Sequence, residues 1–252
     1  MKFITGKPAA VIGENLVVAD VHVGFEFELQ KKGVRITPQP KELAQEFNAL
    51  LKQCKARNLV VLGDFKHDVG GFEQRERKIV EEFRRELLAE NLIVVKGNHD
   101  SLLEKVQGIT VIPAEGIVLR EGNKSFGLHH GHAWPAKELF SCDYLLMGNN
   151  HPAIEFRDSL GSRWVQKAWV HGAIKAKGGN AALAEQRGVK GGKKAIVFPA
   201  FSSLYAGTPF NRVENFELLG PLFKNNLFDL QNALAYSLDG VKLGKISELR
   251  KS

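Results

Sequence analysis

The stretch "LVVLGD" at residues 59–64 sets the pattern on which the fold depends. Four apolar residues, two of them β-branched, run directly into a glycine and an acid. Four related runs stand elsewhere in the chain: LVVAD (16–20), LIVVKGN (92–98), DYLLMGNN (143–150) and AIVFPAF (195–201). Short, nearly continuous apolar runs of this kind are typical of strands that are buried on both faces. The sequence therefore predicts a buried sheet at the centre of the fold.

Helical patterns alternate with these strands in the first half of the chain. Residues 40–57 begin with proline and repeat apolar residues at helical spacing, and residues 73–90 show the same apolar spacing. Strand and helix in alternation predict an α/β fold. From residue 122 the apolar runs become shorter and closer together, which favours a second, more antiparallel sheet packed on the first, with a further helix at 225–238.

Length and composition narrow the class of protein. A chain of 252 residues and 27.9 kDa can bury a sizeable core, and we expect one domain over residues 1–252. It has no apolar run long enough for a membrane span and no signal-peptide pattern at its start, so we expect a cytoplasmic protein without a membrane partner. The sequence leaves the oligomeric state open.

Positive charge is concentrated in one part of the chain. Residues 157–194 hold nine basic and two acidic residues, an excess equal to the net charge of +7. Within them, residues 172–194 are glycine-rich and are expected to form a mobile basic insertion. Together with Trp164 and Trp169 this region would suit a nucleic-acid strand, but a solvated charged face with tryptophans packed under a strand explains the same pattern.

Metal-binding residue types follow the apolar runs. Asp20 and His22 come after the first run and Asp64 ends the second, while the others are Asn98, His99, Asp100, His129, His130, His132 and His151. In an open α/β sheet, ligand sites form beyond the carboxyl ends of the strands, so these side chains are expected at one edge. Carboxylates and imidazoles suit Mn, Fe, Zn or Ni, and two such ions can together support phosphoryl transfer.

Five ordered motifs carry a family resemblance. They are D-x-H at 20–22, G-D at 63–64, G-N-H-D at 97–100, H-G-H at 130–132 and G-x-x-H at 148–151. In this order they resemble the motifs of the calcineurin-like metallophosphoesterases. Three longer stretches, ADVHVGFEFELQKKGVRI (19–36), GDFKHD (63–68) and FPAFSSLYAGTPFN (198–211), resemble the archaeal branch related to the DNA-ligase-associated (ICC-like) metallophosphoesterases.

The resemblance implies a four-layer αββα sandwich, two packed mixed sheets flanked by helices, with a centre for two divalent ions. Asp20, His22 and His151 would hold the first ion, and Asp64 would bridge both. Asn98 and His130 would hold the second, with Asn149 beside them. His99 would be the general acid that protonates the leaving oxygen, Asp100 would orient its ring, and a metal-bridging hydroxide would attack the phosphorus.

Asn149 stands where the family motif places a histidine. An amide oxygen is a harder and weaker ligand than an imidazole nitrogen, so we expect the second ion to be held loosely. Mn is the preferred ion, with Fe, Zn, Ni or Mg as alternatives. A second interpretation is that Asn149 only caps the turn after the strand.

Three further residues are candidates for substrate binding. Lys66 and His67 directly follow Asp64 in the motif, and His132 lies two residues after His130. Each can contact a phosphate, and each can equally belong to a polar loop.

These patterns predict a metal-dependent phosphoesterase, in particular a phosphodiesterase or nuclease whose substrate can be a nucleic acid. The alternatives are a phosphomonoesterase or cyclic-nucleotide phosphodiesterase, and a degenerate, metal-poor scaffold that binds a partner protein.

Overall fold

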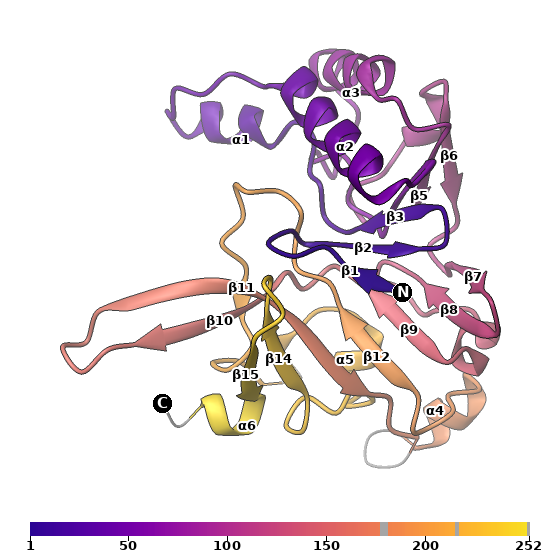
Figure 1. The fold of residues 1–252 in the computed structure, drawn as a ribbon, viewed down its shortest axis with the longest axis vertical. Helices are drawn as coiled ribbons and strands as arrows, with labels where there is room; N and C mark the ends of the chain where they lie inside the picture. Colours follow the sequence, from indigo (N-terminus) through magenta and orange to yellow (C-terminus); the bar gives the residue numbers. More distant parts are fainter. Residues whose placement is uncertain (177–180, 215–216, 251–252) are drawn as a thin grey trace.

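The computed structural model describes residues 1–176, 181–214 and 217–250. It contains two mixed β-sheets with helices on their outer faces (Figure 1). The first sheet has six strands in sequence order: β1 (Lys2–Phe3), β2 (Ala9–Ile12), β3 (Asn15–Val18), β4 (Asn58–Val61), β5 (Asn91–Val95) and β6 (Ile109–Ile112). Strands β3 to β6 run parallel, while β1 and β2 pair antiparallel at one side.

The second sheet is built from the later part of the chain. Its strands are β7 (Ile117–Glu121), β8 (Lys124–Leu128), β9 (Tyr144–Met147), β10 (Pro152–Arg157), β11 (Arg163–Ala173), β12 (Lys194–Val197), β13 (Thr208–Pro209), β14 (Leu234–Ser237) and β15 (Lys242–Lys245). They are ordered β13-β10-β11-β12-β9-β8-β7, and β14 pairs with both β11 and β15. Most pairs are antiparallel, but β9 runs parallel to β8 and β12, and β10 runs parallel to β13. The prediction of a second, more antiparallel sheet is confirmed.

Successive side chains of a strand point to opposite faces of the sheet, and this alternation gives each sheet one core under the helices and one core between the sheets. In β3, Leu16 faces the core formed with α2 (Pro40–Cys54) and α3 (Gln74–Glu86), whereas Val17 faces the core between the sheets. On the outer face of the second sheet lie α4 (Ala181–Gln186), α5 (Pro221–Lys224) and α6 (Ile246–Leu249). Two mixed sheets with flanking helices are therefore confirmed, although the helices over the second sheet are short.

Two helices end earlier than predicted. Helix α2 ends at Cys54 because Lys55 takes a left-handed conformation, and α3 ends at Glu86 because Leu87 is extended. The helix predicted at 225–238 is wrong. Residues Leu234–Ser237 alternate between half-buried and buried positions and pair with β11, so a two-residue period prevails there.

The glycine-rich segment predicted at 172–194 is partly structured. Its first two residues belong to β11, its last to β12, and residues 181–186 form α4, whose Ala184 is buried in the core. Residues 177–180 lie outside the described residues. Of the two tryptophans near it, Trp169 is buried between the sheets while Trp164 is 51% exposed.

The remaining helical elements lie in connections. They are α1 (Phe25–Lys31) and two 3₁₀ turns, η1 (Leu103–Lys105) and η2 (Lys137–Ser141). Within the described parts of the chain, no helix combines the length and apolar character that a membrane crossing requires.

Candidate metal centre

The predicted ligands follow the carboxyl ends of parallel strands from both sheets. Asp20 and His22 follow β3, Asp64 follows β4, His130 follows β8 and His151 follows β9. Three groups have ligand atoms within 4.8 Å of one another: Asp20, His22 and His151; Asp20, Asp64 and His130; and His22, His67 and His99. The structure thus brings both sheets' strand ends to one cluster of metal-binding side chains.

Left-handed backbone conformations mark these positions. Among the described non-glycine residues, eight have positive φ, and five of them are predicted ligands: Asp20, His22, Asp64, Asn149 and His151. Such conformations are uncommon for residues with a Cβ atom, and they concentrate at functional sites. Asp20 and His22 do not lie on the strand itself, because β3 ends at Val18. A bent loop turns both side chains into the cluster instead.

Glycines next to the ligands leave room for them. A Cβ atom on Gly63 would lie 2.3 Å from the His130 ring, and one on Gly97 would lie 2.2 Å from Asp64 Oδ1. Both distances are far below van der Waals contact. The glycines before Asp64 and Asn98 are therefore required by the close approach of a second metal-binding side chain.

One part of the cluster is formed by two imidazoles and a carboxylate. His22 Nε2 lies 3.5 Å from His151 Nε2, and the latter lies 3.3 Å from Asp20 Oδ1. Burial lowers the pKa of His22 to about 2, against the opposing effect of Asp64. The His22 ring is therefore neutral and offers a lone pair, which is the state in which histidine binds a metal.

The other part joins His130 to both carboxylates. His130 Nδ1 donates to the Leu62 carbonyl at 2.7 Å, so Nε2 is directed at Asp64 Oδ2, 3.3 Å away. Burial lowers the pKa of His130, but Asp64 and Asp20 outweigh it and raise the pKa to about 10. For Asp64, burial raises the pKa, but the His130, His99 and His22 rings outweigh burial and lower the pKa below its ordinary value. The two buried carboxylates thus strongly stabilise a positive charge placed beside them.

Asn149 and Asn98 are placed differently. The backbone N–H of Asn149 donates to both oxygens of Asp20 at 3.1 Å, and its buried Nδ2 has no hydrogen-bond partner among the described residues. Asn98 is exposed, and no hydrogen bond or ion pair joins it to the cluster within the described parts of the chain. Its role as a ligand stays a prediction.

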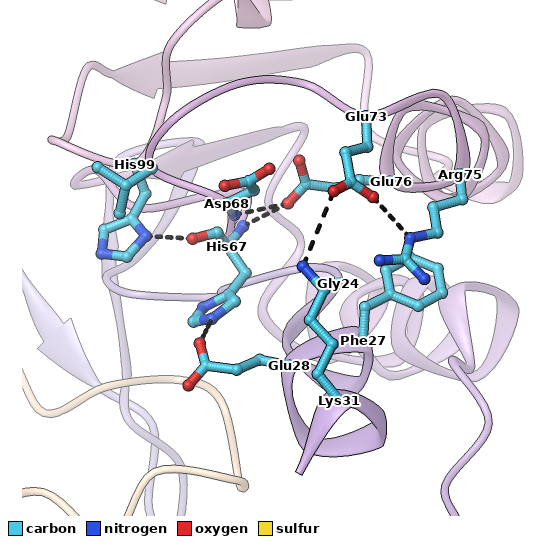
Figure 2. Close-up of a pocket in the computed structure, with 11 residues that line it drawn as sticks. Gly24, Phe27, Glu28, Lys31, His67, Asp68, Glu73, Arg75, Glu76 and His99 are labelled. Atoms are coloured by element: carbon cyan, nitrogen blue, oxygen red, sulfur yellow. Dashed lines mark hydrogen bonds and ion pairs between the residues drawn. The ribbon is translucent and has the colours of Figure 1, made fainter. Parts of the chain in front are cut away.

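His99 lies at the edge of the cluster with its ring held by a backbone carbonyl. Its Nδ1 donates to the His67 carbonyl (Figure 2). Its Nε2 lies 3.7 Å from Asp64 Oδ2. Asp100 does not orient this ring, contrary to our expectation. Its buried carboxylate accepts from the backbone N–H groups of Phe65, Lys66 and Gly97, and so ties the two ligand-bearing loops together.

A second contact group surrounds His67. His67 Nε2 lies 2.5 Å from Glu28 Oε2, and His67 Nδ1 lies 3.5 Å from His22 Nδ1 and 3.4 Å from the Tyr205 hydroxyl. Hydrogen bonds from Lys32 and then His67 lower the pKa of Glu28 to about 2, so it is a carboxylate. The sequence reasoning missed Glu28 and Tyr205, because only the fold brings α1 and the 198–207 loop beside His67.

The remaining candidate side chains, Lys66, His132 and His129, differ in burial and in their contacts. Lys66 is fully buried, and its ammonium bonds to the Asp68 and Gly71 carbonyls 3.6 Å from Glu76, so the prediction that it binds substrate is wrong. His132 is half-buried with its ring 5.1 Å from that of His130. His129 is fully buried, and neither ring nitrogen has a hydrogen-bond partner among the described residues.

Two cavities adjoin the cluster. One of about 200 Å³ reaches His67 and His99, and Glu28 and Lys31 of α1 line its wall opposite Arg75 and Glu76 of α3 (Figure 2). The other, of about 430 Å³, begins at His22 and lies between the 36–46 segment and Ser202 to Leu204. Open space therefore adjoins the cluster at His67 and His99 and again at His22.

A family model describes this combination of fold and motifs. The model of the calcineurin-like phosphoesterases matches residues 16–197, more than half of the chain. The chain belongs to the calcineurin-like phosphoesterase family. It is accordingly a metallophosphoesterase, a hydrolase with Asp and His clusters suited to a pair of metal ions. None of the curated proteins matches the chain.

Several solved structures resemble this one. The nuclease MPE of Pseudomonas putida is 17% identical, with a TM-score of 0.54 over 91% of this chain and 88% of that one, and this likeness shows the fold alone. The phosphoesterase Yfce of E. coli is 15% identical over 91% and 96% of the two chains, with a TM-score of 0.39. A zinc complex of Vps29 from Entamoeba histolytica is 20% identical over 77% and 80%, with a TM-score of 0.34. The last two superpose too loosely to bear on function.

The residues of this phosphoesterase fit a metal pair. His130 Nε2 and Asn149 Nδ2 are buried without hydrogen-bond partners among the described residues, and two imidazole nitrogens face each other beside Asp20. Buried polar atoms of this kind cost free energy unless a partner satisfies them. A cation would satisfy the ring nitrogens and the carboxylates together, whereas the Asn149 amide would have to turn its oxygen toward it.

Proposed function

We propose that the protein is a metal-dependent phosphodiesterase that acts on nucleic acid. The observation that carries this proposal is the open space of two cavities beside the Asp and His cluster. A phosphodiester has an ester group on each side of its phosphorus, whereas a monoester has only one. Two open cavities beside the centre can take up both ester groups and therefore favour a diester, and open cavities favour a strand over a small cyclic nucleotide.

We assign the ligands as the sequence predicted them. Asp20, His22 and His151 would hold one ion, Asp64 would be shared, and His130 with Asn149 and Asn98 would hold the other. Mn suits this mixture of carboxylate, imidazole and amide. When bound, the ions supply Lewis acidity toward the phosphoryl oxygens and an activated nucleophile. The neutral amide of Asn149 makes the second site the weaker one.

His99 would supply the proton that the leaving group needs. Because its Nδ1 donates to the His67 carbonyl, the proton available for transfer is on Nε2, the atom that faces Asp64. The ring is 18% exposed and lines the smaller cavity, where a leaving oxygen can reach it. His67, held by Glu28, would position substrate in the same cavity, and His132 lies close to His130 for the same purpose.

We also infer that the chain lies in the branch related to the DNA-ligase-associated enzymes. The three stretches that resemble that branch contribute one residue each to the contact group of Glu28, His67 and Tyr205. Because these stretches are far apart in sequence, their contact at one point in the structure supports the inference that they belong to one functional site.

Two chromogenic substrates test the proposed function. With Mn present, the wild-type protein should hydrolyse bis-p-nitrophenyl phosphate faster than p-nitrophenyl phosphate. A reversed preference would favour the phosphomonoesterase. No hydrolysis of either ester by folded, metal-loaded protein would favour the scaffold that binds a partner.

A further inference from the structure

Strands β10 and β11 form an arm that reaches away from the rest of the second sheet (Figure 1). Strand β10 begins at Pro152, directly after the predicted ligand His151, and it ends at Arg157. At a rise of roughly 3.3 Å per residue, Arg157 lies about 20 Å along the strand from His151. The arm therefore starts at the metal centre and carries its outer residues well away from it.

On one face of the arm, a single acid is surrounded by two arginines of the arm and by Arg212, which follows β13. The register pairs Glu155 with Val165 and Arg157 with Arg163, and residues two apart on a strand share a face. Glu155 Oε1 accepts from Arg157 Nε at 2.9 Å and Arg212 Nε at 3.1 Å, and Arg163 Nη1 lies 3.9 Å from Glu155 Oε2. Three guanidinium groups around one carboxylate leave an excess of positive charge.

The two arginines of the arm remain accessible. The side chains of Arg157 and Arg163 are 55% and 72% exposed, while the carboxylate between them is 7% exposed. A guanidinium group has five N–H donors, and the contacts with Glu155 use few of them. The outward donors are suited to a phosphate, which arginine can bind through two parallel hydrogen bonds.

The same face leads back to the centre. Lys167, opposite Ala153 in the register, donates to the Ala200 and Ser202 carbonyls at 2.8 Å and 2.5 Å. The backbone of Ser202 in turn donates to the carbonyl of Asp20 at 3.2 Å. A chain lying on this face would thus pass from the arginines to the loop that packs on the metal ligands.

We propose that the Arg157 and Arg163 face of the β10–β11 arm binds the phosphate backbone of a nucleic-acid strand whose scissile bond lies at the metal centre. This inference rests on the proposed function and specifies how a polymeric substrate is held. Continuity with a phosphoesterase centre favours a nucleic acid over an acidic protein. Trp164 stacks on Phe156 on the opposite face, so the contact relies on charge rather than on base stacking.

The test compares two double variants in binding to fluorescent oligothymidylate of twenty nucleotides. Arg157→Gln with Arg163→Gln removes the arm's charges and leaves Arg212 to pair with Glu155. Lys52→Gln with Arg85→Gln removes two exposed charges from α2 and α3 and is the control. Binding is measured in EDTA over a range of salt concentrations, so that no strand is cut.

Loss of two phosphate contacts should reduce the slope of log affinity against log salt by about 1.4, at about 0.7 per contact for a single strand. The control should keep the wild-type slope, and so should Arg157→Lys with Arg163→Lys, which keeps the charges. Equal slopes for the arm variant and the wild type would overturn the inference. Tighter binding of polyglutamate than of the oligonucleotide, lost in the arm variant, would overturn it as well.

Hydrolysis of bis-p-nitrophenyl phosphate separates this inference from the proposed function. The arm variant should hydrolyse this small diester at the wild-type rate, because the substrate does not reach the arm. If the wild type hydrolyses the diester and the arm variant binds the oligonucleotide as tightly as the wild type does, the role of the arm is overturned and the proposed function stands. Oligonucleotide binding without any hydrolysis by the wild type would overturn the proposed function, and with it the claim that the bound strand is a substrate.

Discussion

The Nε2 atoms of His22 and His151 lie 3.5 Å apart, and His151 Nε2 is 3.3 Å from an oxygen of Asp20. Two ring nitrogens at this distance can share a proton or a cation, and the neighbouring carboxylate favours the cation. Glycines, left-handed loop residues and strands of two sheets all contribute to this arrangement. The fold thus uses strain and close approach to keep several ligands together before any ion binds.

Gly63→Ala should displace His130 and weaken Mn binding, because the new Cβ atom would lie 2.3 Å from the His130 ring. Gly13→Ala is the matched control, since Gly13 also has positive φ but has nothing within 4 Å of the added Cβ. Both variants should lose roughly 1–2 kcal/mol of stability from the left-handed backbone. Isothermal titration with Mn should separate them, and equal affinities would refute the steric explanation.

His99→Ala should lower kcat by about 10² to 10⁴ if this ring protonates the leaving group. Metal content should stay at the wild-type level, because His99 Nε2 is 3.7 Å from Asp64 and not part of the predicted ligand set. Steady-state kinetics and elemental analysis of the same preparation provide the check. Loss of an ion together with activity would make His99 a ligand instead.

Asn149→His should tighten the second ion by about tenfold, equivalent to about 1.4 kcal/mol, because an imidazole is a better donor than an amide. Histidine tolerates the left-handed conformation of this position better than most residues do. Asn150→His is the control, since Asn150 bonds through its amide to the backbone of Leu219 and should only lose stability. An unchanged Mn affinity in the Asn149 variant would mean that this side chain does not bind metal and only caps its turn.

His171 should make stability depend on pH. Burial lowers its pKa to about 4, and Nε2 has no partner among the described residues. Between pH 6.5 and 4 the unfolded chain binds a proton there that the folded protein does not, so stability falls as pH falls through this window. By pH 5 the loss is up to roughly 2 kcal/mol. In urea unfolding, His171→Phe should lose less stability than the wild type between pH 7.5 and 5, and parallel losses would contradict this.

Several features of the fold follow from the sequence because they depend on local pattern. The apolar runs at 59–64 and 92–98 became β4 and β5, since uninterrupted β-branched residues suit a strand with two buried faces. The motifs likewise placed Asp64 and His130 directly after strands, and the ends of these strands meet in the fold although they belong to different sheets. Where the pattern was mixed, as at 225–238, pairing with β11 decided the structure, and no local signal announces such a partner.

Side-chain partnerships were harder to predict than positions. Lys66 and Asp100 look like site residues because they stand in the motifs. Both are buried, however: Lys66 donates to loop carbonyls, and Asp100 accepts from backbone N–H groups. Glu28 reaches His67 from a separate helix, 39 residues away in sequence. The motifs identify which loops form the site, whereas tertiary packing decides which of their side chains face it.

Metal stoichiometry measured together with activity tests the central claim most directly. Elemental analysis of the purified protein would be paired with hydrolysis of bis-p-nitrophenyl phosphate as Mn is titrated. We predict two ions per chain at saturation, with activity that rises as the second, weaker site fills. A folded protein that binds one ion at most and hydrolyses nothing at any Mn concentration would contradict a binuclear phosphodiesterase.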